Sequence, residues 1–157
     1  MNGRMNSIVG IDSNVLIYAA DSRSEQYLRA NKFLTEVANG VRLGVITYQN
    51  LTEYFATVTN KKKTSHVLTA ERAVEEMEKL LHTDVKLVFP NAGTRRVFLE
   101  VLRSKKVTAQ KVHDVFLAAT FISNGVTKLV TENPKDFKGI KGLEVMDLTE
   151  YLDEYVG

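Results

Sequence analysis

Short apolar runs alternate along the chain with longer segments in which apolar residues recur every three or four positions. The short runs are rich in Val and Ile and show little polar alternation, which is typical of strands buried on both faces of a parallel sheet. They predict five strands, at residues 8–11, 42–46, 85–89, 128–131 and 143–146.

The longer segments predict helices at residues 14–20, 25–38, 51–58, 70–81, 94–102, 108–123 and 149–155. Two of them carry apolar stripes that we expect to face the core, Leu51, Tyr54, Phe55 and Val58 in one and Val74, Met77, Leu80 and Leu81 in the other. Strands that alternate with helices predict the α/β class, with helices on both faces of a mostly parallel sheet of about five strands. A length of 157 residues favours a single domain over residues 1–157.

The absence of cysteine excludes disulfides and thiolate zinc sites, and an intracellular, cytoplasmic location is the natural expectation. We see no signal-peptide pattern and no apolar run of the ~20 residues that a membrane helix needs, so we expect no membrane association. A net charge of +2 is too small to indicate nucleic acid by itself. Basic residues are nevertheless clustered, and each cluster taken alone is typical of a solvated surface: Lys61–Lys63, Arg95–Arg96, Lys105–Lys106, and Lys135, Lys138 and Lys141.

Asp12 ends the first predicted strand and leads into an apolar helix. Two explanations are open for a carboxylate in this position. It can cap the helix, because Asp satisfies free backbone N–H groups there. It can also lie in the crevice at the carboxyl ends of the strands, where open α/β sheets bind their ligands.

Asp114 shares a helical face with Leu117, Ala118, Phe121 and Ile122. With the helix beginning near residue 108, Asp114 lies one to two turns inside it, which is too deep for a capping residue. A buried charge must be paired, hydrogen-bonded or bound to metal, so the pattern indicates either a structural ion pair or a ligand. Its neighbour His113 points about 100° away around the helix, as expected for a surface or packing residue.

The segment from Thr131 to Asp136 follows the fourth strand. Asn133 before Pro134 is typical of a helix start, with Asp136 at the third helical position. The same segment brings Thr131, Asn133 and Asp136 to the edge of the sheet where Asp12 lies. Oxygen ligands gathered in this way suit hard cations such as Mg²⁺ and Mn²⁺.

Taken together, four segments in order resemble the PIN-domain nucleases, and most closely the short VapC-type toxins of prokaryotic toxin–antitoxin pairs. The resemblance covers nearly the whole chain and is carried by residues 11–16 (IDSNVL), 50–55 (NLTEYF), 113–119 (HDVFLAA) and 130–137 (VTENPKDF). It implies a three-layer α/β/α fold and a Mg²⁺- or Mn²⁺-dependent ribonuclease whose metal is held by Asp12, Asp114 and Glu53. The pattern of the residues alone places Glu53 off the apolar stripe, as a surface charge.

One position departs from the family. Many members have a further acid two residues after the strand-end threonine, where this chain has Asn133. Asp136 can supply the missing charge, or the site works with three carboxylates and an amide, which leaves the number of metal ions open. Ser13, Asn14 and Thr131 match polar positions that hydrogen-bond ligands or water. An RNA substrate, a small antitoxin that lays a helix along a groove, and a homodimer are also implied by the resemblance.

Two other functions remain open at this point. The chain can be a non-catalytic RNA-binding or RNA-processing domain with this fold. Asn133 favours this alternative, because it replaces an acid that many members of the family have. It can also be a receiver-like α/β domain in which Asp12 is phosphorylated, although the order of the other segments does not fit that class.

Overall fold

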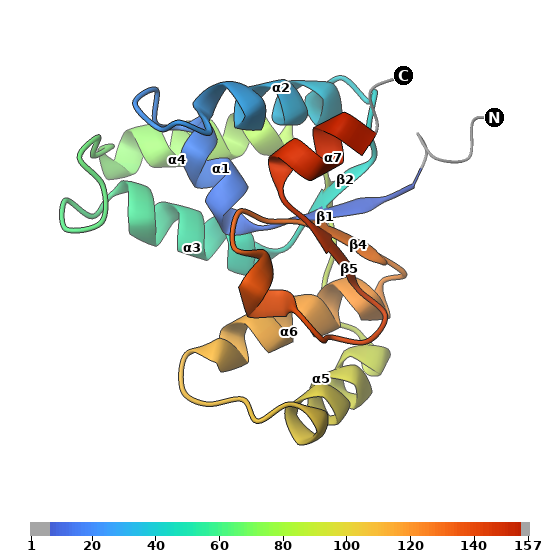
Figure 1. Ribbon diagram of the computed structural model, residues 1–157. Helices are drawn as coiled ribbons and strands as arrows, with labels where there is room; N and C mark the ends of the chain where they lie inside the picture. Colours follow the sequence, from blue (N-terminus) through green and yellow to red (C-terminus); the bar gives the residue numbers. More distant parts are fainter. Residues whose placement is uncertain (1–6, 155–157) are drawn as a thin grey trace.

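A computed structural model describes residues 7–154 and shows a parallel sheet between two layers of helices (Figure 1). The strands lie in the order β3-β2-β1-β4-β5, and every neighbouring pair is parallel. Their bounds are β1 Val9–Ile11, β2 Gly44–Ile46, β3 Lys86–Leu87, β4 Lys128–Val130 and β5 Glu144–Met146. The predicted α/β class, with about five strands in a mostly parallel sheet, is confirmed.

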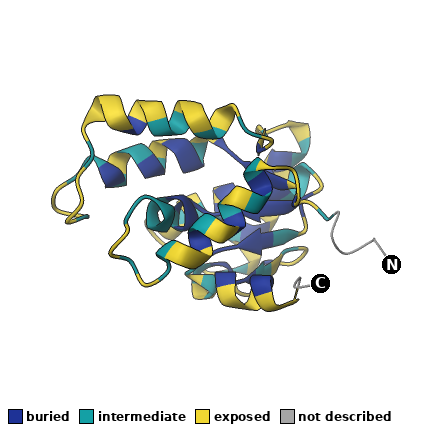
Figure 2. Cartoon of the chain, turned by 90° about the horizontal axis from the view of Figure 1, so that it is seen from above, coloured by how far each residue is buried: buried dark blue, intermediate teal, exposed yellow. Residues whose placement is uncertain are grey.

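The helices divide between the two faces of the sheet. They are α1 Ser13–Ala19, α2 Tyr27–Ala38, α3 Tyr48–Val58, α4 Ala70–Leu81, α5 Ala92–Ser104, α6 Lys111–Ser123, the 3-10 helix η1 Pro134–Phe137, and α7 Leu148–Glu154. One apolar core joins the sheet to α1, α2, α3, α4 and α7, and a second joins it to α5, α6 and η1. Figure 2 shows buried residues on the sides of the helices that face inward and exposed ones on their outer sides.

The strands contribute to both cores because successive side chains point to opposite faces. Ile46 and Val130 pack into the first core, whereas Val45 and Leu129 pack into the second. Both faces are therefore apolar, which explains why the strands appear as continuous apolar runs in the sequence. Close packing also requires Gly44 in β2, because a Cβ there would lie 2.6 Å from Cγ1 of Val37 in α2.

Several predicted boundaries and faces need correction. Val74 and Leu81 of α4 were expected to face inward, but they are 42% and 41% exposed. The reason is that α4 packs mainly on α3 rather than on the sheet, so that only a narrow stripe around Ala73 is covered. Tyr155, the predicted end of the last helix, lies outside the described residues.

The start of α6 also differs from the prediction. Ala109 has a left-handed backbone conformation, with φ of +50°, and the helix begins at Lys111 instead of residue 108. Asp114 consequently lies in the first turn of the helix, not one to two turns inside it. Among residues 7–154, no helix has both the length and the apolar character needed to span a lipid bilayer.

Candidate active site

The centre of the sheet delivers two polar residues side by side. β1 pairs with β4 so that Ile11 lies opposite Val130, and Asp12 and Thr131 are the next residues to leave the two strands. Thr131 Oγ1 donates a hydrogen bond of 2.7 Å to Asp12 Oδ2. Both residues are buried, Asp12 with 8% of its surface exposed and Thr131 with none.

Asp12 combines the two explanations that its position left open. Its Oδ1 accepts a hydrogen bond of 2.7 Å from the backbone N–H of Ser13, the first residue of α1, for which Asp12 is the N-cap. Its other oxygen is held by Thr131. These two donors fix the carboxylate at the carboxyl edge of the sheet, where each oxygen still has a lone pair free for a ligand.

Asn14 fixes the chain that follows β4. Its Nδ2 donates to Thr131 Oγ1 at 3.2 Å, and its Oδ1 accepts from the backbone N–H of Glu132 at 3.2 Å. Asn14 therefore clamps the start of α1 to the end of β4, which keeps Thr131 in position to bind Asp12.

Glu53 accepts hydrogen bonds from Ser13 of α1 and Gln49 of α3, and both donors make further contacts. Ser13 Oγ donates to Glu53 Oε2 at 2.6 Å, and Asn50 Nδ2 donates to Ser13 Oγ at 3.0 Å. Gln49 Nε2 donates to Glu53 Oε1 at 3.0 Å and to the backbone oxygen of His113 at 2.9 Å. The structure thus ties α1, α3 and the start of α6 together around one carboxylate, and the interpretation of Glu53 as a surface charge is wrong.

Local structure explains how α3 presents these groups. Thr47, at the end of β2, is the N-cap of α3 and forms a capping box with Asn50. Asn50 is completely buried and uses its Oδ1 for this cap and its Nδ2 for Ser13. One turn further along the helix, Glu53 then points toward the same edge as Asn50.

Asp114 and Asp136 complete a group of four carboxylates. Asp114 is half-buried in the first turn of α6, which packs against η1, the helix that carries Asp136. Asp136 is the charge that acts most strongly on Asp114, followed by Asp12 and Glu53. The structure therefore brings together Asp12, Glu53, Asp114 and Asp136.

Burial and mutual repulsion perturb two of these acids. Burial raises the pKa of Asp12 to about 6, although hydrogen bonds from Thr131 and Ser13 oppose this change. Burial is also the largest cause that raises the pKa of Asp114 to about 6, with the neighbouring carboxylates adding to it and Lys111 opposing it. Both acids are hard to ionise without a cation nearby.

None of the four carboxylates forms an ion pair with Lys or Arg within residues 7–154. Asp114 accepts no hydrogen bond in the same range. Gln49 Oε1, beside Glu53, is buried with no hydrogen-bond partner among the described residues. Carboxylate and amide oxygens in this state fit a hard divalent cation and its water molecules.

These oxygen atoms are of the chemical type that a divalent cation prefers, but they are not arranged around a common centre. No group of three or more Asp, Glu or His side chains in residues 7–154 is spaced as the ligands of a single metal ion. Asp12 is fixed by two hydrogen bonds, whereas Asp114 accepts none from the described residues and is the less restrained of the two carboxylates.

The predicted helix start at Asn133 and Pro134 is confirmed, but the Asn133 side chain does not cap the helix. Asn133 is the N-cap residue of η1, with Pro134 at the first position, but its side chain makes no capping hydrogen bond. The side chain is exposed, and the backbone N–H instead donates to Thr131 Oγ1 at 3.1 Å. Asn133 therefore supports Thr131 through its backbone.

Sequence reasoning missed two residues of this network, Asn50 and Gln49. Asn50 stands three residues after a strand-end threonine, which is the spacing of a capping box and could have singled it out. Gln49 carried no such signal, because its partners lie in α6 and one turn along α3.

No family model and no curated protein matches the sequence. Solved structures do match the fold. VapBC-1 from nontypeable Haemophilus influenzae gives a TM-score of 0.64 at 20% identity, over 90% of this chain and 98% of that chain. DNA-bound VapBC from Salmonella typhimurium gives 0.62 at 20% identity, over 92% and 99%.

A third similar structure is VapC20 from Mycobacterium tuberculosis, which is described as a toxin that cleaves the sarcin–ricin loop. It gives a TM-score of 0.55 at 11% identity, over 77% of this chain and 86% of that chain. At these identities the comparison establishes the architecture. The chain has the three-layer α/β/α fold of the VapC-type PIN domains.

Proposed function

We propose that this protein is a Mg²⁺- or Mn²⁺-dependent ribonuclease and the toxin of a toxin–antitoxin pair. The observation that carries the proposal is the group of four carboxylates at one edge of the sheet, without a cationic partner in the described chain. A group of this kind costs stability, since burial and repulsion oppose ionisation. Carboxylates whose pKa values are raised by burial and by one another are typical of a functional site.

Asp12 and Asp114, with Glu53, would hold the divalent cation. When bound, the cation supplies Lewis-acid stabilisation of phosphate charge and lowers the pKa of a water molecule that attacks phosphorus. Whether a second cation takes part depends on Asp136, which acts electrostatically on both Asp12 and Asp114.

The protein's own part in the reaction is to hold these oxygens still. Thr131 and the Ser13 N–H orient Asp12, while Ser13 Oγ and Gln49 orient Glu53. Groups that orient metal ligands in this way commonly change activity or metal affinity 10–100-fold when removed. Ser13 serves both carboxylates, through its backbone and its hydroxyl, so it couples their positions.

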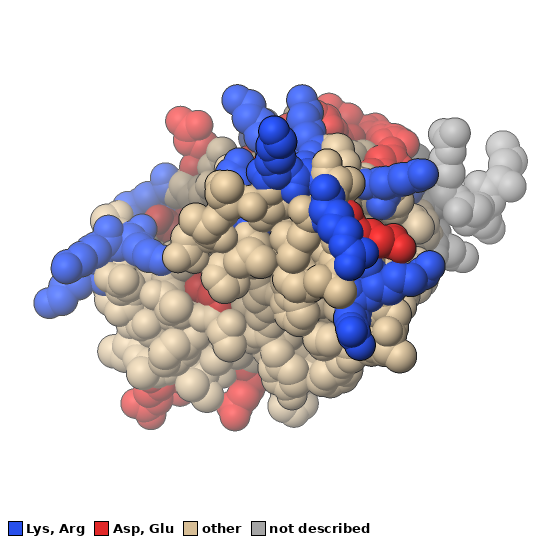
Figure 3. All heavy atoms as spheres, turned by 90° about the horizontal axis from the view of Figure 1, so that it is seen from below, with Lys and Arg blue, Asp and Glu red and all other residues tan. Residues whose placement is uncertain are grey.

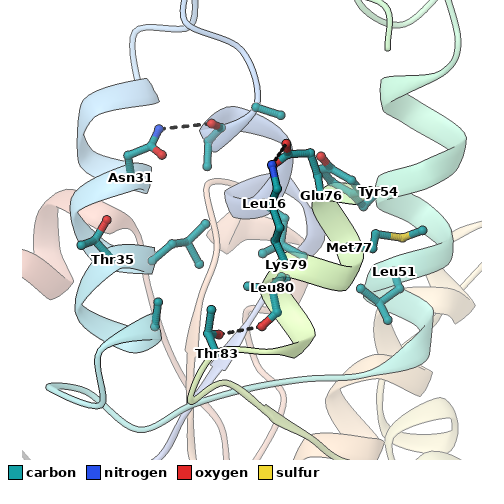
Figure 4. Close-up of a pocket in the computed structure, with 14 residues that line it drawn as sticks. Leu16, Asn31, Thr35, Leu51, Tyr54, Glu76, Met77, Lys79, Leu80 and Thr83 are labelled. Carbon is teal, nitrogen blue, oxygen red and sulfur yellow. Dashed lines mark hydrogen bonds and ion pairs between the residues drawn. The ribbon is translucent and has the colours of Figure 1, made fainter. Parts of the chain in front are cut away.

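We propose an antitoxin partner because similar structures are toxin–antitoxin complexes, such as one from Klebsiella pneumoniae. A groove with a volume of about 260 Å³ lies between α1, α2, α3 and α4 (Figure 4). Its lining is mainly apolar and includes Leu16, Leu34, Leu51, Met77 and Leu80. An apolar face of an antitoxin helix fits such a groove. A homodimer is proposed from the resemblance alone.

A cleavage assay tests the catalytic part of the proposal. Purified protein is incubated with mixed-sequence RNA in Mn²⁺, Mg²⁺ or EDTA, and the fragments are separated by size. We expect fragments only with a divalent cation, none from Asp12→Asn, and unchanged cleavage from Asp153→Asn, which alters an exposed acid of α7. Protein that binds the RNA but never cleaves it would instead indicate the non-catalytic RNA-binding domain.

A further inference from the structure

Two basic clusters that are far apart in the sequence meet in the fold. Lys105, directly after α5, donates a hydrogen bond from Nζ to the backbone oxygen of Lys138, directly after η1. The same ammonium group lies against Gly139, where a Cβ would be 3.9 Å from Nζ. Apolar packing of Val101, Phe137 and Ile140 in one core holds the two segments together.

Five lysines lie on the segments that meet here, namely the end of α5, the start of α6, which packs on η1, and η1 with the residue after it. We call them the basic ridge: Lys105, Lys106, Lys111, Lys135 and Lys138. None of them pairs with a carboxylate in residues 7–154, whereas Arg72 and Lys79 of α4 pair with Glu76. Figure 3 shows the face formed by α5 and α6, where Lys and Arg side chains are gathered on one half and the other half is mainly uncharged. Unpaired like charges repel one another, so their gathering favours an anionic partner.

The basic ridge borders the carboxylates on two sides. Lys111 opens α6 one turn before Asp114 and acts on its charge. Lys135 immediately precedes Asp136 in η1 and is exposed. A polyanion held on the ridge would therefore lie directly beside the acids. The acids alone would repel it, so the ridge supplies the attraction that they lack.

The lysine triplet Lys61–Lys63 is placed differently. It follows the C-terminal end of α3, whereas Gln49 and Glu53, which contact the site, lie in the N-terminal half of that helix. Figure 1 shows the loop between α3 and α4 projecting beyond the end of α3. The triplet thus offers three exposed lysines, as the ridge does at Lys106, Lys135 and Lys138, but at a different place in the fold.

We propose that the basic ridge is the surface along which the phosphodiester backbone of RNA reaches the carboxylates, and that Lys61–Lys63 takes no part. The proposal rests on the ribonuclease function proposed above and adds the direction of approach. Contacts to phosphate carry no sequence information, so the ridge would position RNA of any sequence, leaving base selection to other groups.

Two triple variants of equal charge change test this assignment. The ridge variant is Lys106→Gln, Lys135→Gln and Lys138→Gln, which leaves Lys105 and its packing contact in place. The control variant is Lys61→Gln, Lys62→Gln and Lys63→Gln. All six side chains are exposed, and thermal unfolding verifies that both variants keep the parent's fold.

Binding is measured by the fluorescence anisotropy of a labelled single-stranded RNA in EDTA, over a series of KCl concentrations. The ridge variant should bind roughly tenfold or more weakly, and the slope of log K against log salt should fall by about 2, as expected for three lost contacts at ~0.7 each. In Mn²⁺, KM should rise while kcat stays near the parent's value. The control variant should match the parent in each measurement.

Equal weakening by both variants would show a general effect of net charge and overturn the assignment. A ridge variant that binds RNA as the parent does would also overturn it, whatever its affinity for a protein partner. Failure of the ribonuclease function looks different, because the parent itself would then give no metal-dependent fragments.

Discussion

Replacing Asp114 by asparagine separates what this carboxylate does for function from what it costs in stability. The substitution keeps the shape of the side chain and removes its charge. Because Asp114 accepts no hydrogen bond and forms no ion pair within residues 7–154, no partner among these residues is left stranded. The metal-free variant should therefore be at least as stable as the parent, although it loses RNA cleavage.

The size of the effect follows from the pKa of Asp114, which burial and three neighbouring acids raise from 3.8 to about 6. A rise of about 2 pKa units corresponds to about 3 kcal/mol between the protonated and ionised forms. Asp114 is only half-buried and water screens its charge, so we expect about 1–2 kcal/mol.

The sign depends on pH. The folded state holds the proton of Asp114 more tightly than the unfolded state, so the free energy of unfolding decreases as pH rises from about 4 to about 6. The gain from Asp114→Asn should be near zero at pH 4 and should reach its full value above pH ~6.5. Urea denaturation in EDTA at several pH values measures it, with Asp153→Asn as a control that alters an exposed carboxylate.

The opposite result would refute the reasoning. If Asp114 were a structural acid paired with a cation, its loss would strand that cation and cost about 3–5 kcal/mol at neutral pH. A variant that is destabilised to this extent in EDTA and still cleaves RNA in Mn²⁺ would remove Asp114 from the active site.

Three further outcomes are expected. Mg²⁺ or Mn²⁺ should raise the melting temperature of the parent, because the ion binds the folded state, and Asp12→Asn should abolish the shift; a full shift in that variant would make Asp12 purely structural. Asp136→Asn should reduce cleavage strongly and Asn133→Asp should not, since Asp136 acts on both Asp12 and Asp114 while Asn133 is exposed; loss of stability without loss of cleavage would place Asp136 outside the site. Ser13→Ala should lower cleavage 10–100-fold, as measured by kcat, because Glu53 loses its orienting hydroxyl; an unchanged kcat would contradict this role.

The sequence predicted the sheet well because both of its faces are buried, so each strand appears as an apolar run between polar segments. It predicted the inner face of α4 poorly. Val74 and Leu81 follow the helical period, but periodicity does not tell how much of a stripe another element covers. The start of α6 was missed for a local reason, the left-handed turn at Ala109, a residue type that gives no signal for it.

The candidate site shows the same division between local and tertiary information. Asp12 was accessible from the pattern, because a carboxylate at the end of a buried strand has few explanations. Glu53 could not be found in this way, because the contact that draws it inward comes from Ser13, which lies 40 positions earlier in the chain.

Asn50 combines local and tertiary information. Its spacing from Thr47 is a local capping signal, yet its amide also donates to Ser13 of another helix. Asn50 is completely buried and serves two purposes. Its Oδ1 accepts a hydrogen bond at the start of α3, and its Nδ2 holds Ser13 in the candidate site. The same holds for Asp12, which caps α1 with one oxygen while Thr131 holds the other. In this fold the helix caps at the edge of the sheet also hold the carboxylates of the proposed active site, so substituting them should lower RNA cleavage as well as stability.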